Sequence, residues 1–125
     1  MIDTCTFLWW MSEPPLLSRR ARQFLLERSN DIVLSAASGW EIAIKRKLGR
    51  IELPLATASF IADALSAHAI TVLPITMAHA IRAGDLPLHH KDPFDRLIIA
   101  QADIENIPVA TPDRNFSAYP IEAVW

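Results

Sequence analysis

The sequence predicts an α/β fold built from βαβ units around a parallel sheet. Strand-like and helix-like segments alternate along the chain, which is typical of such units. Four acids, Asp3, Glu41, Asp95 and Asp113, each stand at or just beyond an end of a short apolar run. If the runs before Asp3, Glu41 and Asp113 are parallel strands, these side chains meet at the carboxyl edge of the sheet, where open α/β folds place their sites.

Local signals delimit the elements of the first half of the chain. Pro14 and Pro15 end a first helix, Ser18 is suited to cap a second, and Gly49 is a stop signal for a third. Only two residues precede Asp3, whereas a parallel strand usually has about five, so we expect the true start to lie upstream. The expected elements are a strand stub at 1–3, helices at 6–10 and from 18 to about 28, a strand at 32–35 and a helix ending at 48.

The second half carries similar signals. Thr57 is placed to cap one helix, and Gly84 to end the next. In Asp92-Pro93-Phe94-Asp95 the first acid fits the N-cap of a helix, the proline fits N1 and the second acid fits N3. The expected elements are helices at 58–67, 76–83 and from 93 to about 105, and strands at 70–73, 109–111 and 122–125.

Bulk properties narrow the class of protein. The 125 residues predict a single domain over 1–125. No apolar run approaches the roughly 20 residues of a membrane span, and Asp3 interrupts the start too early for a signal peptide. Cys5 is the only cysteine, which excludes an internal disulfide and fits a reducing cytoplasm. A net charge of −2 does not indicate nucleic-acid binding; basic clusters at 19–22 and 45–50 fit a solvated helix face as well as a phosphate track.

The four acids have structural as well as catalytic interpretations. Asp95 at N3 and Asp92 at the N-cap suit helix capping, and Asp113 suits a turn. Glu41 can form an ordinary i,i+4 pair with a lysine one turn on. Asp3 is hardest to explain structurally, because an acid at a sheet edge beside tryptophans needs a partner. A carboxylate cluster repels itself unless a hard divalent cation compensates it, so the combination predicts metal-assisted chemistry on a phosphate ester.

Other polar and aromatic residues are assigned milder roles. Lys45 and Arg96 are candidates for contacts with a substrate backbone, although helix-surface ion pairs are the favoured alternative. Adjacent histidines in a loop seldom face one ion, so we expect His89 and His90 to face solvent or line a substrate rim. We expect His68, His79 and the inert Cys5 to be structural, and the tryptophans to be core or interface anchors.

Four segments, taken together, resemble a known family. They are MIDTCTFLWW (1–10), LSAASGWEIAIK (34–45), LPLHHKDPFDRLIIAQA (86–102) and TPDRNF (111–116). In this order and spacing the chain resembles the PIN-domain ribonucleases, and among them the VapC-type toxins of bacterial toxin–antitoxin pairs. The resemblance implies a three-layer α/β/α sandwich with a central parallel sheet of about four to five strands.

The resemblance also implies a metal-dependent endoribonuclease that binds one or two Mg²⁺ or Mn²⁺ ions. Position by position, the catalytic and metal-binding acids are Asp3, Glu41, Asp95 and Asp113. Thr111 stands where a hydroxyl supports the site, and Asp92 is a possible fifth acid. The chain departs from the family at Cys5, where histidine is frequent, and at Pro112, which stiffens the turn before the last acid.

Implied partners are an RNA substrate, a second copy of the chain in a homodimer, and a VapB-like antitoxin. The antitoxin's C-terminal segment would lie across the toxin and block the acidic pocket. Apolar side chains would fill a groove, and an arginine would engage two carboxylates. The groove residues that we expect on the toxin are Trp9, Trp10, Leu16 and Leu17.

Other functions remain open at the level of sequence. A non-catalytic binding module could retain the fold, although the presence of all four acids argues against it. A response-regulator receiver needs a lysine near the last strand, and none follows Lys91. A haloacid-dehalogenase-type phosphatase needs Asp-x-Asp at the first strand, and position 5 is Cys5.

Overall fold

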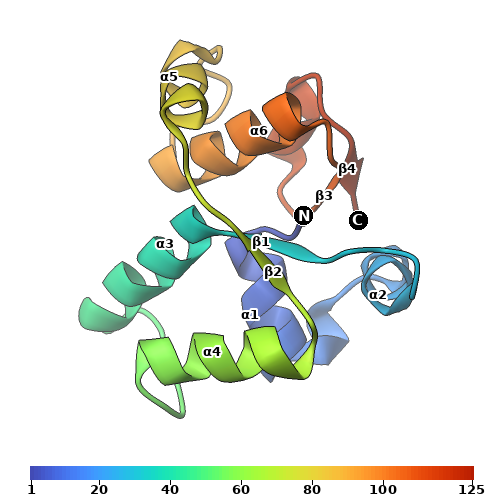
Figure 1. Cartoon of the computed structure of the whole chain (residues 1–125), viewed down its shortest axis with the longest axis vertical. Coiled ribbons are helices and arrows are strands. Elements are labelled where there is room, and N and C mark those ends of the chain that lie inside the picture. Colours follow the sequence, from blue (N-terminus) through green and yellow to red (C-terminus); the bar gives the residue numbers. More distant parts are fainter.

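The structure is a computed structural model that describes residues 1–125, and it places a parallel sheet between two layers of helices (Figure 1). Its elements, in chain order, are α1 (Thr4–Ser12), the 3₁₀ helix η1 (Pro14–Leu16), α2 (Arg19–Leu26), β1 (Val33–Ser35), α3 (Ala36–Lys47), α4 (Thr57–Ala67), β2 (Thr71–Leu73), α5 (Met77–Asp85), α6 (Pro93–Glu105), β3 (Val109–Ala110), the 3₁₀ helix η2 (Arg114–Ala118) and β4 (Ala123–Val124).

One residue, Ile2, joins the two halves of the sheet. β1 pairs in parallel with β2, with Val33 opposite Thr71, and β3 pairs in parallel with β4. Ile2 forms parallel bridges to Leu34 on one side and to Ala110 on the other. The order across the sheet is therefore β2, β1, Ile2, β3, β4. The predicted central parallel sheet is confirmed, and its first strand is reduced to this single bridging position.

Successive residues of these strands point to opposite layers, because the side-chain period of a strand is two. One face packs against α1 to α4, in a buried cluster that includes Ile2, Leu34, Phe7, Ile42 and Phe60. The other packs against α5, α6 and η2, in a cluster that includes Met1, Val109, Ile98, Ile99 and Phe116. Figure 1 shows α5 and α6 above the strands and α1, α3 and α4 below them. The fold is the three-layer α/β/α sandwich that the family resemblance implies.

Several helix ends follow the predicted signals. The Ser18 hydroxyl accepts a hydrogen bond from the Ala21 amide at 3.0 Å, and Asp92 accepts one from the Phe94 amide at 2.8 Å. Gly49 follows the last turn of α3 with a φ of 68°, a left-handed conformation that glycine adopts at little cost. These local signals predict the helix ends correctly because each cap is formed within four residues of its own helix end.

Several boundaries differ from the prediction, most of them by one or two residues. α1 begins at Thr4 rather than residue 6, because the side chain of Asp3 caps it. Thr57 is the first residue of α4 and not its cap; Ala56 occupies the N-cap without a side-chain hydrogen bond. α5 continues through Gly84 to Asp85. Its N-cap is formed by Thr76 and the buried ring of His79, so this histidine has the structural role that was predicted.

Arg96 ties the connection between α5 and α6 to the start of α6. Its side chain is buried, and its guanidinium donates to five backbone oxygens, those of Ala83, Gly84, Leu86, Pro87 and His90, at 2.7–3.3 Å. Both predicted roles, a substrate contact and a surface ion pair, are therefore wrong. A planar fork with five donors suits this task, since a loop that turns back on itself leaves several carbonyls without partners.

None of the helices has the length and apolar character that a membrane crossing requires.

Candidate active site

The four predicted acids line one pocket at the carboxyl edge of the sheet. They come from the turn after Ile2, from α3, from the first turn of α6 and from the turn after β3. The pocket has a volume of about 270 Å³ and is lined by Asp3, Thr4, Cys5, Glu41, Lys45, Asp92, Asp95, Pro112 and Asp113. Lys45 lines this pocket, where it forms the favoured ion pair, and Arg96 does not line it.

Asp3 is the most deeply buried of the acids, with 4% of its surface exposed. Oδ1 accepts a hydrogen bond from the Thr6 amide at 2.7 Å, and Oδ2 accepts one from the Thr111 hydroxyl at 2.6 Å. Burial raises the pKa of Asp3, against the lowering effect of these hydrogen bonds, and the nearby charge of Glu41 raises it further. Asp3 thus combines a helix-capping role with a place in the pocket, and Thr111 supports it directly.

Glu41 has one oxygen satisfied and one without a partner. Oε1 pairs with Lys45 Nζ at 2.5 Å, the i,i+4 pair that its spacing suggested. Oε2 is buried and has no hydrogen-bond partner. A buried carboxylate oxygen without a donor is costly, so this atom requires a ligand that the chain itself does not supply.

The position of Glu41 depends on a polar contact at the start of α3. The Ser35 hydroxyl accepts from the Ala37 amide and donates to Gln101 of α6. Gln101 also donates to the Pro74 carbonyl at 3.2 Å. The end of β1, the start of α3 and α6 are thereby fixed relative to one another.

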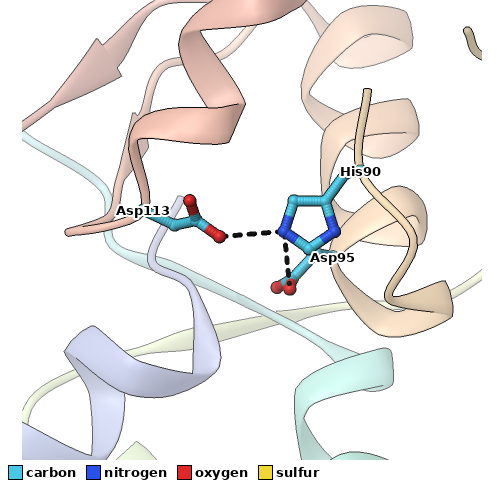
Figure 2. A group of neighbouring side chains, drawn as sticks. All are labelled: His90, Asp95 and Asp113. Atoms are coloured by element: carbon cyan, nitrogen blue, oxygen red, sulfur yellow. Dashed lines mark hydrogen bonds and ion pairs between the residues drawn. The ribbon is translucent and has the colours of Figure 1, made fainter. Parts of the chain in front are cut away.

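The carboxylates of Asp95 and Asp113 both contact the same nitrogen of the His90 ring (Figure 2). His90 Nε2 lies 2.8 Å from Asp113 Oδ2 and 3.3 Å from Asp95 Oδ2. No hydrogen bond joins the Asp95 carboxylate to a helix amide, so the predicted N3 capping role is not formed. Asp113, by contrast, caps η2 through the Asn115 amide at 2.8 Å.

The carboxyl groups of Asp95 and Asp113 differ in how readily they ionise. Burial raises the pKa of Asp95 to about 7; the contact with the His90 ring opposes this effect, and the negative charges of Asp92, Glu41 and Asp3 add to it. Burial also acts on Asp113, but hydrogen bonds from the Asn115 amide and from His90 outweigh it and lower the pKa. Asp113 is held as an anion, and Asp95 gains a proton most readily when no cation is near.

The prediction that His90 faces solvent or a substrate rim is wrong. Its side chain is 10% exposed and lies between two of the acids, whereas the neighbouring His89 is exposed, as predicted, against the ring of Tyr119. The direction of the His90 ring is set by contacts with residues far along the chain. No local sequence signal distinguishes the two histidines.

Cys5 and Asp92 stand at the margin of the site. Burial, followed by the charge of Asp3, raises the pKa of the Cys5 thiol to about 11, so the thiol stays protonated and inert at neutral pH, as predicted. Asp92 is exposed at the rim, where its main contact is the cap of α6.

A second hollow, of about 220 Å³, adjoins the acidic pocket. It shares Pro112 and Asp113 with that pocket, and its other lining residues are Arg20, Thr111, Arg114, Ser117, Ala123 and Trp125. Arg20 and Arg114 are both exposed there. Arg20 belongs to the basic cluster at 19–22 in the sequence, but Arg19 and Arg22 line a different surface. Arg114 belongs to neither of the two basic clusters of the sequence.

The predicted apolar groove is formed in part. Trp9 lines a hollow of about 310 Å³ with Leu8, Ile51 and Leu53. Leu17 is 5% exposed and belongs to the core, so its assignment to the groove is wrong.

The donors around the acidic pocket fit a hard divalent cation. Carboxylate oxygens are the ligands that Mg²⁺ and Mn²⁺ prefer. Glu41 Oε2 has no hydrogen-bond partner, and the buried Asp3 has no cationic partner, because Lys45, the only cationic side chain lining the pocket, pairs with Glu41 Oε1. A divalent cation would remove both deficits.

Comparison with known proteins gives a consistent result. The PIN domain family model matches residues 1–122. Over 120 residues, which are 95% of this chain and 90% of the relative, the sequence is 32% identical to ribonuclease VapC22 of Mycobacterium tuberculosis. Ribonuclease VapC16 of the same organism is 38% identical over 58 residues, 46% of this chain and 41% of the relative.

The raised pKa of Asp95 predicts that the metal-free protein loses stability as pH rises. Below about pH 4 both folded and unfolded chains hold the proton. Between pH 4 and 7 the unfolded chain releases it first, so the free energy of unfolding falls, by about 1–3 kcal/mol, and then levels off above pH 7. Thermal unfolding in EDTA from pH 4.5 to 8 measures this decline.

Asp95→Asn removes the titrating group, so its melting temperature should fall less over this range and exceed that of the wild type at pH 8. Asp63→Asn, a change at an exposed acid of α4, is the matched control and should keep the wild-type slope. Equal slopes for the wild type and Asp95→Asn would contradict the assignment.

Proposed function

The chain belongs to the PIN domain family, and from this premise we propose that it is a VapC-type toxin, an endoribonuclease that uses a divalent metal to hydrolyse RNA phosphodiester bonds. One observation carries the proposal. Four carboxylates from four separate segments line a single pocket, and one of their buried oxygens, Glu41 Oε2, has no partner in the chain. Such a cluster is unfavourable unless it is used to bind a cation.

Mg²⁺ or Mn²⁺ would be held by Asp3, Glu41, Asp95 and Asp113. When bound, the ion supplies activation of water and neutralisation of charge on the phosphoryl oxygens. The chain supplies orientation. Thr111 fixes Asp3, and Lys45 occupies Glu41 Oε1 so that Oε2 is left for the ion.

The RNA backbone needs cations beside an acidic pocket that would otherwise repel it. Lys45 lies within the pocket, and Arg20 and Arg114 line the hollow that adjoins it across Pro112. We place the RNA chain across these two hollows, with phosphates near the arginines. Arg96 has no part in this, because its donors are used on backbone carbonyls.

The alternatives fit less well. A non-catalytic module would not need four acids converging on one pocket. A receiver or phosphatase would need a second acid beside Asp3, and Cys5 lines that part of the pocket. We place the protein in the cytoplasm, where a lone thiol stays reduced. We propose a homodimer and a VapB-like antitoxin as its partners.

The purified protein should cleave single-stranded RNA when Mg²⁺ or Mn²⁺ is added, and excess EDTA should stop the cleavage. Glu41→Gln and Asp95→Asn should each reduce the rate by at least about 100-fold, because each removes charge that the ion requires. Asp63→Asn should cleave like the wild type. Gel analysis of a labelled RNA gives the rates, and full activity in excess chelator would rule out the metal mechanism.

Arg20→Ala and Arg114→Ala should raise KM for RNA about 3- to 10-fold and leave kcat within about twofold, since each removes a phosphate contact away from the reacting bond. The dependence of log KM on log salt should also become shallower. Arg19→Ala, on the same helix but outside the adjoining hollow, should change neither quantity. Equal effects of Arg19→Ala and Arg20→Ala would show that only overall charge matters.

Expression of the chain alone should arrest growth, and co-expression with the protein of the neighbouring reading frame should restore it. The masking protein needs apolar side chains for the hollow around Trp9 and an arginine for the acids. Asp95→Asn should be harmless alone yet still co-purify with the neighbour. Unaffected growth together with failure to co-purify would refute the toxin–antitoxin assignment while leaving the nuclease intact.

A further inference from the structure

His90 lies at the centre of the acidic site, although nothing in the family resemblance assigned it a role. It belongs to the connection between α5 and α6, and its ring contacts acids from two other segments (Figure 2). Nε2 is 2.8 Å from Asp113 Oδ2 and 3.3 Å from Asp95 Oδ2. The other ring nitrogen, Nδ1, is 3.1 Å from the backbone nitrogen of Asp92.

The last contact determines which nitrogen carries the proton. A backbone N–H can only donate, so Nδ1 must accept from the Asp92 amide and cannot itself carry hydrogen. In the imidazole ring the proton is then on Nε2, which donates to the carboxylates. A nitrogen that carries a proton is not a metal ligand. His90 is therefore a hydrogen-bond donor to the acids and does not join them in coordination.

His90 is held through both its backbone and its ring. The His90 amide donates to the Tyr119 hydroxyl at 2.7 Å, and that hydroxyl donates in turn to the Pro87 carbonyl at 2.9 Å. Arg96 donates to the His90 carbonyl at 3.2 Å. The imidazole ring of His90 packs edge-on against the ring of Phe116, with 6.0 Å between the ring centroids. A side chain fixed in this way transmits its position to whatever it contacts.

From this arrangement we propose that His90 is a positioning residue, which holds Asp113 and Asp95 in the geometry that receives the metal. The inference rests on the proposed function. A neutral donor is well suited to this task. It keeps two repelling carboxylates together without cancelling the negative charge that attracts the ion, as a lysine or arginine would.

The effect extends to the third acid. The Asp113 amide donates to the Thr111 hydroxyl at 3.1 Å, and that hydroxyl donates to Asp3 Oδ2 at 2.6 Å. His90, Asp113, Thr111 and Asp3 thus form one continuous chain of hydrogen bonds. A shift of Asp113 alters the support of the most buried carboxylate, so loss of the His90 ring disturbs the site beyond its two direct contacts.

The test compares His90→Ala, His90→Gln and His89→Ala for Mn²⁺ affinity, measured by electron paramagnetic resonance on the whole protein, and for kcat and KM on RNA. His90→Ala should bind Mn²⁺ about 10- to 100-fold more weakly and lose kcat with little change in KM, because outer hydrogen-bond partners of metal ligands have effects of this size. His90→Gln should restore much of the affinity, since its amide nitrogen takes the place of Nε2. His89→Ala should match the wild type.

Three outcomes would overturn the inference. Unchanged or tighter Mn²⁺ binding by a folded His90→Ala protein would show that His90 does not position the ligands, while the nuclease assignment would stand. Equal loss in His90→Ala and His90→Gln would show that the imidazole itself, and not a donor at that point, is required. If the wild type bound no Mn²⁺, the proposed metal mechanism would fail first, and this inference with it.

Discussion

Mutual repulsion among carboxylates at the carboxyl edge of the sheet is the constraint around which the site is built. Asp3 and Glu41 are almost fully buried, and Asp95 is partly so. Water cannot screen these groups as it would at the surface, so each needs a donor or a cation. The hydroxyl of Thr111, the ammonium of Lys45 and the ring of His90 meet this need only in part. A divalent ion would compensate the negative charge that remains.

The fold fixes the acids by tying together distant parts of the chain. Ile2 bridges β1 and β3, and this places Asp3 directly between the ends of two strands. Gln101 links α6 to the start of α3, which carries Glu41. Arg96 fixes the connection that carries His90. The polar groups that form these hydrogen bonds are buried and paired. The residues behind the acids are therefore rigid, and they bring no charged group into the pocket.

The cations are distributed in a way that suits a polyanionic substrate. Lys45 is committed to Glu41, yet it remains partly exposed in the pocket. Arg20 and Arg114 lie in the adjoining hollow, which meets the acidic pocket at Pro112 and Asp113, and neither arginine lines the acidic pocket itself. No ion pair joins either arginine to the acids, so the arginines leave the negative charge of the acidic pocket in place, whereas charges of opposite sign placed in contact would neutralise each other.

The sequence by itself determined the fold class, the helix-end signals at Ser18, Asp92 and Gly49, and the acids that line the pocket. Caps depend on contacts within one turn, and a residue at the end of a strand lies at the sheet edge wherever that strand is placed. Only the tertiary structure decided where His90, Arg96 and Leu17 point. His90 depends on Tyr119 and Asp113, more than twenty residues away, and Arg96 depends on the path of a loop. Side-chain direction in a connection is set by such distant partners, and no local pattern encodes it.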